Sequence, residues 1–399
     1  MNDDTEEGGT PEGTNRSNAR TVAYFMSVGG SLSKWRREGI LDRESLLLRS
    51  FVENGLAERV LVFTYGHEDD EPLATLRSRH PAFASVELVP PAWGGGGRLG
   101  HLLHSFLGPV ARRSALREAE IMRTNQVSGA WAAAIAARGG RAAFVFRMGY
   151  ILSRRYAKNG QRLRSFVMRM IENRLLSRAD AVIVTSENAR DAMRSRAPAR
   201  TPVTRVPTYV DMSVFRPKTE FDFDGPIVYV GRVTDQKNLS SLVEACAAIG
   251  LPLHIYGVGP DGDMLMERAA ACGADVELKG LLDNTELATR LQDYAIFVLP
   301  SFHEGLPKVM IEAMAVGLVC VGSTIPGITD MIRDGENGYL IDGFTADDIA
   351  EALRRARSER DPTMGARARQ TVERMFGIDA HIEAERAVHH EALRRAGKR

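Results

Sequence analysis

The sequence predicts an α/β fold with two doubly wound domains. Eight short runs rich in β-branched and aromatic residues alternate with longer segments of helical periodicity, and these runs are almost continuously apolar. Apolar strands separated by helices are typical of parallel sheets that are covered on both faces. The chain has 399 residues, of which 44% are hydrophobic, and this length is enough for two domains.

The predicted strands form two sets of four. They are, in order, TVAYFMS, RVLVFTYG, AAFVFRM and AVIVTS, then PIVYVG, LPLHIYG, YAIFVLP and LVCVGS. Between the sets, Pro207, Pro217 and the acidic run DFD interrupt the series, which indicates a linker. The predicted divisions are a disordered tail over residues 1–19, an N-terminal domain over 20–205, a linker over 206–224, a C-terminal domain over 225–375 and a C-terminal helix over 376–399 that packs back on the N-terminal domain.

Charge is distributed unevenly along the chain. Residues 20–205 carry 30 basic and 16 acidic side chains, a net charge of +14, whereas residues 206–399 carry 21 and 30, a net charge of −9. A basic domain attracts phosphorylated substrates, polyanions or anionic lipid surfaces, although basic residues also serve simply to solubilise a protein. The composition leaves these readings open.

Cysteine use and hydropathy favour a cytoplasmic protein. Cys246, Cys272 and Cys320 are widely spaced, which gives little support to a disulfide or zinc framework. We find no apolar run of about 20 residues that would span a membrane, and no signal-peptide pattern at the N-terminus. We therefore expect a cytoplasmic location, with peripheral attachment to the inner face of the membrane as a further possibility.

One segment of the N-terminal domain suggests such attachment. Residues 154–178 carry eight basic residues and one acidic residue, and their apolar residues recur at helical spacing. These are Leu163, Phe166, Val167, Met170, Ile171 and Leu175. The pattern predicts an amphipathic basic helix, which either packs on the sheet or lies on an anionic membrane surface.

Three stretches of the C-terminal domain contain candidate site residues. In the first, Gly231 follows a predicted strand and is succeeded by Arg232 and Lys237. Ligands of open α/β sheets bind at this edge, where two cations can neutralise a diphosphate. The alternative is ordinary surface charge.

The second stretch, YGVGPDG, places Gly257, Gly259 and Gly262 in a G-x-G-x-x-G spacing between a strand and a helix. In a dinucleotide fingerprint an acidic residue follows the glycines, and here Asp275 and Glu277 follow Gly259 by 16 and 18 residues. The same glycines suit any tight turn from strand to helix, so the spacing keeps a nicotinamide enzyme open only as an alternative.

The third stretch is SFHEGLPKVMIEAMAVG, in which Glu304 and Glu312 lie on either side of Gly-Leu-Pro. Pro307 is predicted at the first position of a helix. The backbone N–H groups at this helix start are free to face an anion, which the helix dipole also favours. Carboxylates accept hydrogen bonds from paired hydroxyls, so the arrangement suits a sugar nucleotide.

Taken together, these stretches resemble the retaining glycosyltransferases of family 4 (glycosyl transferases group 1). The features that carry the resemblance are the E-x7-E pattern from Glu304 to Glu312, the GR…KN segment from Gly231 to Asn238, and YGVGP. The resemblance implies the GT-B fold, in which two Rossmann-like domains face each other across a cleft. The N-terminal domain would bind the acceptor and the C-terminal domain the nucleotide-sugar.

The resemblance also implies roles for individual residues. Arg232 and Lys237 would hold the donor diphosphate and Glu304 the sugar, and these three are the predicted catalytic residues. Glu312 would hold the ribose. The remaining predicted donor-binding residues are Gly29, Gly30, Gly231, Gly257, Gly259, Leu281, Leu282, Gly305 and Leu306.

The sequence departs from the family at the end of the AAFVFRM run. Many members have a histidine there, whereas this chain has Arg147, which cannot act as a general base at neutral pH. Arg147 and Asn125 are predicted to contact the acceptor; the alternatives for Arg147 are support of the diphosphate and a structural salt bridge. We expect no cofactor and no metal, because two cations and a helix N-terminus can stabilise the departing diphosphate.

The predicted function is transfer of a hexose from a UDP-, GDP- or ADP-sugar to a glycan or lipid-linked acceptor. We expect retention of configuration and a place in polysaccharide or envelope glycoconjugate biosynthesis. A nucleotide-sugar 2-epimerase of the same fold is the alternative. A nucleic-acid binding protein that uses the basic N-terminal domain is a second, lower alternative. We expect no nucleic-acid partner, because the basic residues lack interleaved aromatics and no recognition motif is present.

Overall fold

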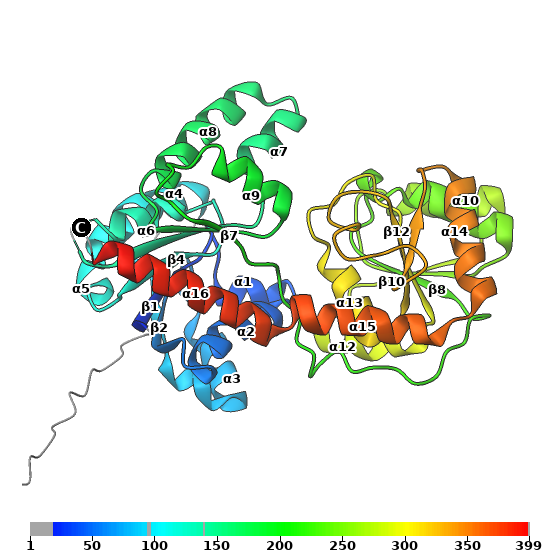
Figure 1. Cartoon of the computed structure of the whole chain (residues 1–399), viewed down its shortest axis with the longest axis horizontal. Coiled ribbons are helices and arrows are strands. Elements are labelled where there is room, and N and C mark those ends of the chain that lie inside the picture. The colour runs from blue at the N-terminus through cyan, green and yellow to red at the C-terminus, as the bar shows by residue number, and fades with distance from the viewer. Residues whose placement is uncertain (1–18, 94–96, 139, 398–399) are drawn as a thin grey trace, which may run out of the picture.

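The computed structural model describes residues 19–93, 97–138 and 140–397. Residues 1–18 of the predicted tail lie outside these ranges, and Ala19 is the first residue of strand β1. Figure 1 shows two α/β units side by side, each with helices around a central sheet. This arrangement confirms the fold class predicted from the sequence.

The N-terminal unit contains a parallel sheet of seven strands in the order β3-β2-β1-β4-β5-β6-β7. Its strands are β1 (Ala19–Phe25), β2 (Ala57–Phe63), β3 (Val86–Val89), β4 (Ile121–Thr124), β5 (Ala143–Met148), β6 (Ala181–Val184) and β7 (Val203–Arg205). Its helices are α1 (Leu32–Arg37), α2 (Leu41–Glu53), α3 (Asp70–Arg79), α4 (Gly97–Ala111), α5 (Arg113–Leu116), α6 (Ala130–Ala136), α7 (Leu152–Lys158), α8 (Arg162–Leu176) and α9 (Glu187–Arg194).

The C-terminal unit contains a parallel sheet of six strands in the order β10-β9-β8-β11-β12-β13. Its strands are β8 (Ile227–Val230), β9 (Leu253–Tyr256), β10 (Val276–Gly280), β11 (Ile296–Leu299), β12 (Val319–Ser323) and β13 (Tyr339–Ile341). Its helices are α10 (Leu239–Ile249), α11 (Gly262–Cys272), α12 (Asn284–Arg290), α13 (Lys308–Val316), α14 (Ala346–Glu359) and α15 (Pro362–Phe376), and α16 (Ile378–Ala396) ends the chain.

Both sheets reverse their strand order at one point. The reversal lies between β1 and β4 in the first sheet and between β8 and β11 in the second. Loops that leave neighbouring strands at such a point diverge to opposite faces, which opens a crevice at the carboxyl ends of the strands. The predicted site residues that follow β1, β4, β8 and β11 are therefore placed at these two crevices, whereas Gly257 and Gly259 follow β9, Leu281 and Leu282 follow β10, and Arg147 lies in β5.

The last helix, α16, returns from the C-terminal unit to the N-terminal one (Figure 1). The chain crosses at Gly377, which forms a bridge with Val210 in the outgoing segment, and the Val210 N–H donates to the Phe376 carbonyl at 2.9 Å. Ile382 and Val388 of α16 are buried in the N-terminal core. The two units are therefore joined by two adjacent crossings.

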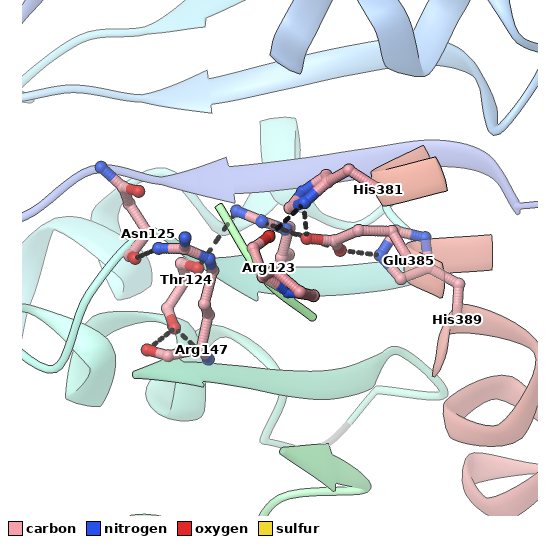
Figure 2. Close-up of polar contacts among 8 residues, drawn as sticks. Arg123, Thr124, Asn125, Arg147, His381, Glu385 and His389 are labelled. Carbon is pink, nitrogen blue, oxygen red and sulfur yellow. Dashed lines mark hydrogen bonds and ion pairs between the residues drawn. The ribbon is translucent and has the colours of Figure 1, made fainter. Parts of the chain in front are cut away.

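A buried ion pair fastens α16 to the N-terminal sheet. The guanidinium of Arg123 in β4 donates to both carboxylate oxygens of Glu385, and neither side chain is exposed to solvent. The Nε2 atoms of His381 and His389 each lie 3.4 Å from the same carboxylate, as Figure 2 shows. Burial favours neutral Glu385, but Arg123 and the histidines outweigh it and hold its pKa well below the usual value.

The single basic helix predicted over residues 154–178 is instead two packed helices. Helix α7 ends at Lys158 and α8 begins at Arg162. Gly160, between them, has φ +71°, a left-handed conformation that favours glycine and ends the first helix. The apolar periodicity predicts the helical residues of α8, but it does not predict the turn between α7 and α8.

Candidate active site

A short turn after β8 fixes the position of Lys237. Residues Asp235–Lys237 form a single 3₁₀ turn. Within it, Gln236 accepts a hydrogen bond from the Phe302 N–H at 3.0 Å, and its side-chain Nε2 donates to the His303 carbonyl at 2.9 Å. These bonds join the loop after β8 to the loop after β11, and they bring Lys237 next to Glu304.

Lys237 and Glu304 form an ion pair in which both side chains are largely buried, at 13% and 10% exposure. The Lys237 ammonium donates a hydrogen bond to Glu304 Oε1. Arg232 lies in the same loop and is exposed, and it forms no ion pair with any residue of the described ranges. The structure therefore brings two of the three predicted catalytic side chains into direct contact and leaves the third available.

The start of α13 differs from the prediction by one residue. Pro307 is the N-cap, and the helix begins at Lys308. The Pro307 carbonyl accepts the N–H groups of Met310 and Ile311. Within the described part of the chain, no acceptor is recorded for the N–H groups of Gly305, Leu306 and Lys308. This end of the helix keeps the unpaired donors that an anion requires.

The glycines of YGVGP are explained by the packing of two loops. A Cβ on Gly257 would lie 1.8 Å from the Gly231 carbonyl oxygen, and one on Gly259 would lie 1.9 Å from the Val233 carbonyl oxygen. Any side chain at either position would therefore collide with the loop after β8. This close approach accounts for the glycine spacing without a dinucleotide fingerprint, and it also supports the loop that carries Arg232 and Lys237.

Glu312 is buried in α13 with only part of its carboxylate satisfied. Its Oε1 lies 3.9 Å from Arg43 Nη1 of helix α2 in the N-terminal unit. Its Oε2 is buried and has no hydrogen-bond partner among the described residues. Burial raises the pKa of Glu312, although Arg43 and Lys308 oppose the shift. The carboxylate thus has room for one more hydrogen-bond donor.

Lys308, Glu44 and Arg43 are site residues that the sequence reasoning missed. Lys308 Nζ lies 3.1 Å from Glu44 Oε1, which joins the start of α13 to α2 across the two units. Partial burial of Glu44 favours its neutral form, but Lys308 and Arg43 outweigh this and lower its pKa. A cation in the first turn of a helix opposes the dipole. That mismatch at Lys308 was the available signal that an anionic partner lies nearby.

Arg147 and Asn125 line a cavity of about 170 Å³ that reaches both units. The cavity is also lined by Gln126 from the N-terminal unit and by Leu306 and Lys308 from the C-terminal unit. Arg147 is largely buried, and its Nη1 donates to the Asn125 carbonyl at 2.9 Å (Figure 2). Burial and the neighbouring Arg123 lower the pKa of Arg147. The two predicted acceptor residues therefore share one cavity.

The remaining predicted residues occupy loops at the strand ends. Leu281 is 73% exposed, whereas Leu282 packs partly against the C-terminal core. The Gly29–Gly30 turn follows β1, and the Gly30 N–H donates to the Ser27 carbonyl at 2.7 Å. A Cβ on Gly29 would lie 3.0 Å from the His101 ring of α4. Only Leu281 of the two leucines presents its side chain fully to a ligand.

The described residues show neither a metal-binding cluster nor a membrane-spanning helix. They contain no group of three or more His, Cys, Asp or Glu side chains placed to hold a metal ion. They also contain no helix that is both long enough and apolar enough to cross a bilayer.

Two protein-family models match this chain, one over most of the N-terminal unit and one over most of the C-terminal unit. Residues 47–214 match the family described as Glycosyltransferase Family 4, and residues 214–373 match the family described as Glycosyl transferases group 1. The chain belongs to the family 4 glycosyltransferases.

Curated relatives of this family 4 chain match it over part of their length. The lipopolysaccharide core biosynthesis glycosyltransferase LpsE of Rhizobium meliloti is 30% identical over 179 residues, which are 43% of this chain and 52% of the relative. The alpha-maltose-1-phosphate synthase of Mycolicibacterium smegmatis is 29% identical over 195 residues, with shares of 43% and 50%. The chain thus spans about half the length of these relatives.

Solved structures match the family 4 chain over almost its whole length. The sucrose-phosphate synthase of Thermosynechococcus elongatus has a TM-score of 0.71 at 20% identity, covering 92% of this chain and 98% of that one. Anabaena HepE in complex with UDP and glucose has a TM-score of 0.67 at 17% identity, with the same coverage. At these identities the likeness establishes the fold, which is GT-B.

Proposed function

We propose that the protein transfers a sugar from a nucleotide-sugar to a glycan or lipid-linked acceptor, with retention of configuration. The observation that carries the proposal is the contact between Lys237 and Glu304 beside the unpaired N–H groups at the start of α13. A cation, a carboxylate and a helix N-terminus at one sheet edge suit a diphosphate that carries a sugar. Relatives with envelope polysaccharide names support a role in that kind of biosynthesis.

In the proposed complex, the diphosphate lies on the N–H groups of Gly305 and Leu306. Arg232 and Lys237 neutralise its charge, and Glu304 accepts hydrogen bonds from hydroxyls of the sugar. Glu312 lies in the second turn of α13, where its free Oε2 accepts a hydrogen bond from a ribose hydroxyl. This arrangement uses the buried oxygen that lacks a partner among the described residues, and so relieves an unfavourable state.

The proposed reaction needs no histidine base. The bond between the sugar C1 and the diphosphate oxygen breaks as the acceptor oxygen forms a bond to C1 on the same face. The proton of the acceptor hydroxyl passes to the departing phosphate oxygen. Arg232, Lys237 and the helix N-terminus stabilise the negative charge that develops on that phosphate. Arg147, which remains protonated, contributes charge to the acceptor cavity rather than proton transfer.

The epimerase alternative is not favoured. Curated relatives that match include glycosyltransferases and an alpha-maltose-1-phosphate synthase. An epimerase would interconvert a lone UDP-sugar in the absence of an acceptor, whereas we expect no such conversion. Chromatographic separation of the two epimers, or proton NMR, after incubation of the UDP-sugar alone checks this point.

Donor class is tested by measuring the thermal shift with UDP, GDP, ADP and their common sugars. We expect one nucleotide family to raise the melting temperature. At a ligand concentration one hundred times the dissociation constant, binding stabilises the folded protein by about 2.7 kcal/mol. The anomeric configuration of a transferred sugar, read by NMR, then tests retention. No shift with any nucleotide, from a well-folded protein, would contradict the proposal.

Nucleotide binding is also expected to depend on pH through Glu312. Because burial raises its pKa, this carboxyl stays protonated to a higher pH than an ordinary glutamate. A ribose hydroxyl that donates a hydrogen bond to Glu312 binds better to the ionised carboxylate. The affinity for the nucleotide should therefore fall as the pH is lowered through the raised pKa of Glu312. Calorimetry across mildly acidic pH measures this effect. Glu312→Gln should bind more weakly and with a flatter pH profile; an unchanged profile would rule out the assignment.

A further inference from the structure

Helix α4 carries its apolar face outward. Its exposed large apolar residues recur at helical spacing, at 45–70% exposure. They are Leu99, Leu102, Leu103, Phe106, Leu107 and Val110. The opposite face, which packs on the protein, consists of His104, Ser105, Gly108 and Pro109. A surface helix of a soluble domain normally buries its apolar stripe, so this inversion indicates that the exposed face has a partner of its own.

The N-terminal half of α8 shows the same feature. Leu163, Phe166, Val167 and Met170 form an i, i+3, i+4, i+7 stripe and are 47–77% exposed. They are flanked by exposed arginines, which form no ion pair with any acid of the described residues. These arginines are Arg154, Arg155, Arg162, Arg164 and Arg169. The stripe therefore lies within a field of uncompensated positive charge.

The two helices that carry these stripes lie on the same side of the N-terminal sheet. Helix α4 packs on α6 through Phe106, whose ring stacks on Trp131 with centroids 5.6 Å apart, and through a 2.9 Å hydrogen bond from Trp131 Nε1 to Ser105. Helix α6 also contacts α8. In Figure 1 the three helices lie on one side of the sheet, with the α7–α8 pair projecting beyond it. We call the exposed apolar residues of α4 and α8 the apolar face.

We infer that the apolar face docks onto an anionic lipid bilayer. Leucine and phenylalanine side chains would enter the boundary between headgroups and acyl chains, while the arginines of α7 and α8 contact lipid phosphates. A peripheral amphipathic helix needs this pairing of an apolar stripe and a basic flank. The inference deepens the proposed function, on which it rests, by placing a lipid-linked acceptor at the surface that the enzyme occupies.

Charge favours a bilayer over a second copy of this chain. In a two-fold interface the same patch meets itself, so the arginines of one α8 would approach those of the other. Residues 20–205 carry a net charge of +14, which strengthens this repulsion. Binding to an anionic surface is instead strengthened by each of these positive charges.

Residues next to the apolar face lie beside the loops at the strand ends of the N-terminal unit. His101, in the second turn of α4, lies against the Gly29–Gly30 turn at the end of β1. At the other end, Tyr150 is 41% exposed and follows Gly149, which lines the cavity with Arg147. Arg155 lies over the Tyr150 ring at 5.7 Å. Docking would therefore bring the cavity that contains Arg147 close to the lipid surface.

Flotation of the full chain with vesicles tests the inference. The vesicles are phosphatidylcholine alone or phosphatidylcholine with phosphatidylglycerol, at low salt and at about 0.15 M salt. We expect binding to the anionic vesicles only. Leu103→Gln with Leu107→Gln, or Phe166→Gln with Met170→Gln, should lower the partition coefficient on the order of tenfold or more. Each of Arg162→Gln, Arg164→Gln and Arg169→Gln should lower it about fivefold, more weakly at higher salt.

The matched control is Met264→Gln, which changes an exposed apolar residue of α11 in the C-terminal unit, at 57% exposure. It should float as the unmodified protein does. Circular dichroism and the nucleotide thermal shift are measured for every variant, so that loss of lipid binding is separated from misfolding and from failure of the proposed function. Absence of flotation at low salt, equal flotation of all variants, or concentration-dependent dimers abolished by Leu103→Gln would overturn the inference.

Discussion

Lys237→Ala is expected to lower the rate of sugar transfer by about 10²- to 10³-fold, the usual effect of removing one preorganised group that stabilises developing charge. Lys237 is largely buried and fixed by the turn that joins the loops after β8 and β11. It therefore acts on the departing diphosphate without reorganising. Steady-state kinetics with the donor identified by thermal shift measures the effect on kcat and KM separately.

Glu304→Gln is the partner measurement. It leaves the Lys237 ammonium in place but removes the charge that it contacts, and it weakens acceptance of sugar hydroxyls. If the two residues act as a unit, the double variant should lose little more activity than the worse single variant. The control is Lys279→Ala, which removes an ion pair with the exposed Glu277 on β10. Full activity in Lys237→Ala would contradict the site assignment.

Arg123→Met is expected to destabilise the protein by about 3–5 kcal/mol, because it leaves the carboxylate of Glu385 buried without its charge partner. The substitution removes the ion pair that joins β4 to α16 (Figure 2). Because α16 is the return crossing, the variant should also loosen the attachment of the two units. Urea unfolding followed by circular dichroism measures the free energy of unfolding.

A second variant separates burial of an unpaired charge from loss of packing. Arg123→Met combined with Glu385→Leu removes both charges and should recover much of the stability. Arg360→Met, which breaks an exposed pair with Asp224, should change stability little and serves as the control. Equal destabilisation by the single and double variants would show that the ion pair is not what Arg123 contributes.

The sequence predicted the longer apolar strands and missed short or more polar ones. All eight predicted runs overlap strands of the structure, whereas β3, β4, β7, β10 and β13 were not predicted. Strand β4 was missed because it has only four residues, IMRT, of which Arg123 and Thr124 are polar. A buried arginine in a central strand is tolerated only because Glu385 neutralises it, and Glu385 is 262 residues away in the chain. Local patterning cannot report a partner at that separation.

The candidate site, too, was only partly predictable from the sequence. Order along the chain was enough to place Arg232, Lys237 and Glu304 at one sheet edge, because parallel strands end on the same side. It did not show that Lys237 and Glu304 contact each other, or that Arg43 approaches Glu312. Those contacts depend on side-chain packing and on how the two units meet.

The sequence by itself determined the α/β class, the two sets of strands and the stretches that contain the site, because hydrophobic periodicity and strand-end loops are local properties. Tertiary structure alone decided which faces are covered. The sequence pattern of an apolar stripe on α4 or α8 is the same whether the stripe packs on a sheet or faces solvent. Periodicity shows only that the residues share one face of the helix. The structure turns both stripes outward, next to the arginines of α7 and α8, and that orientation is what makes a lipid surface the partner to test.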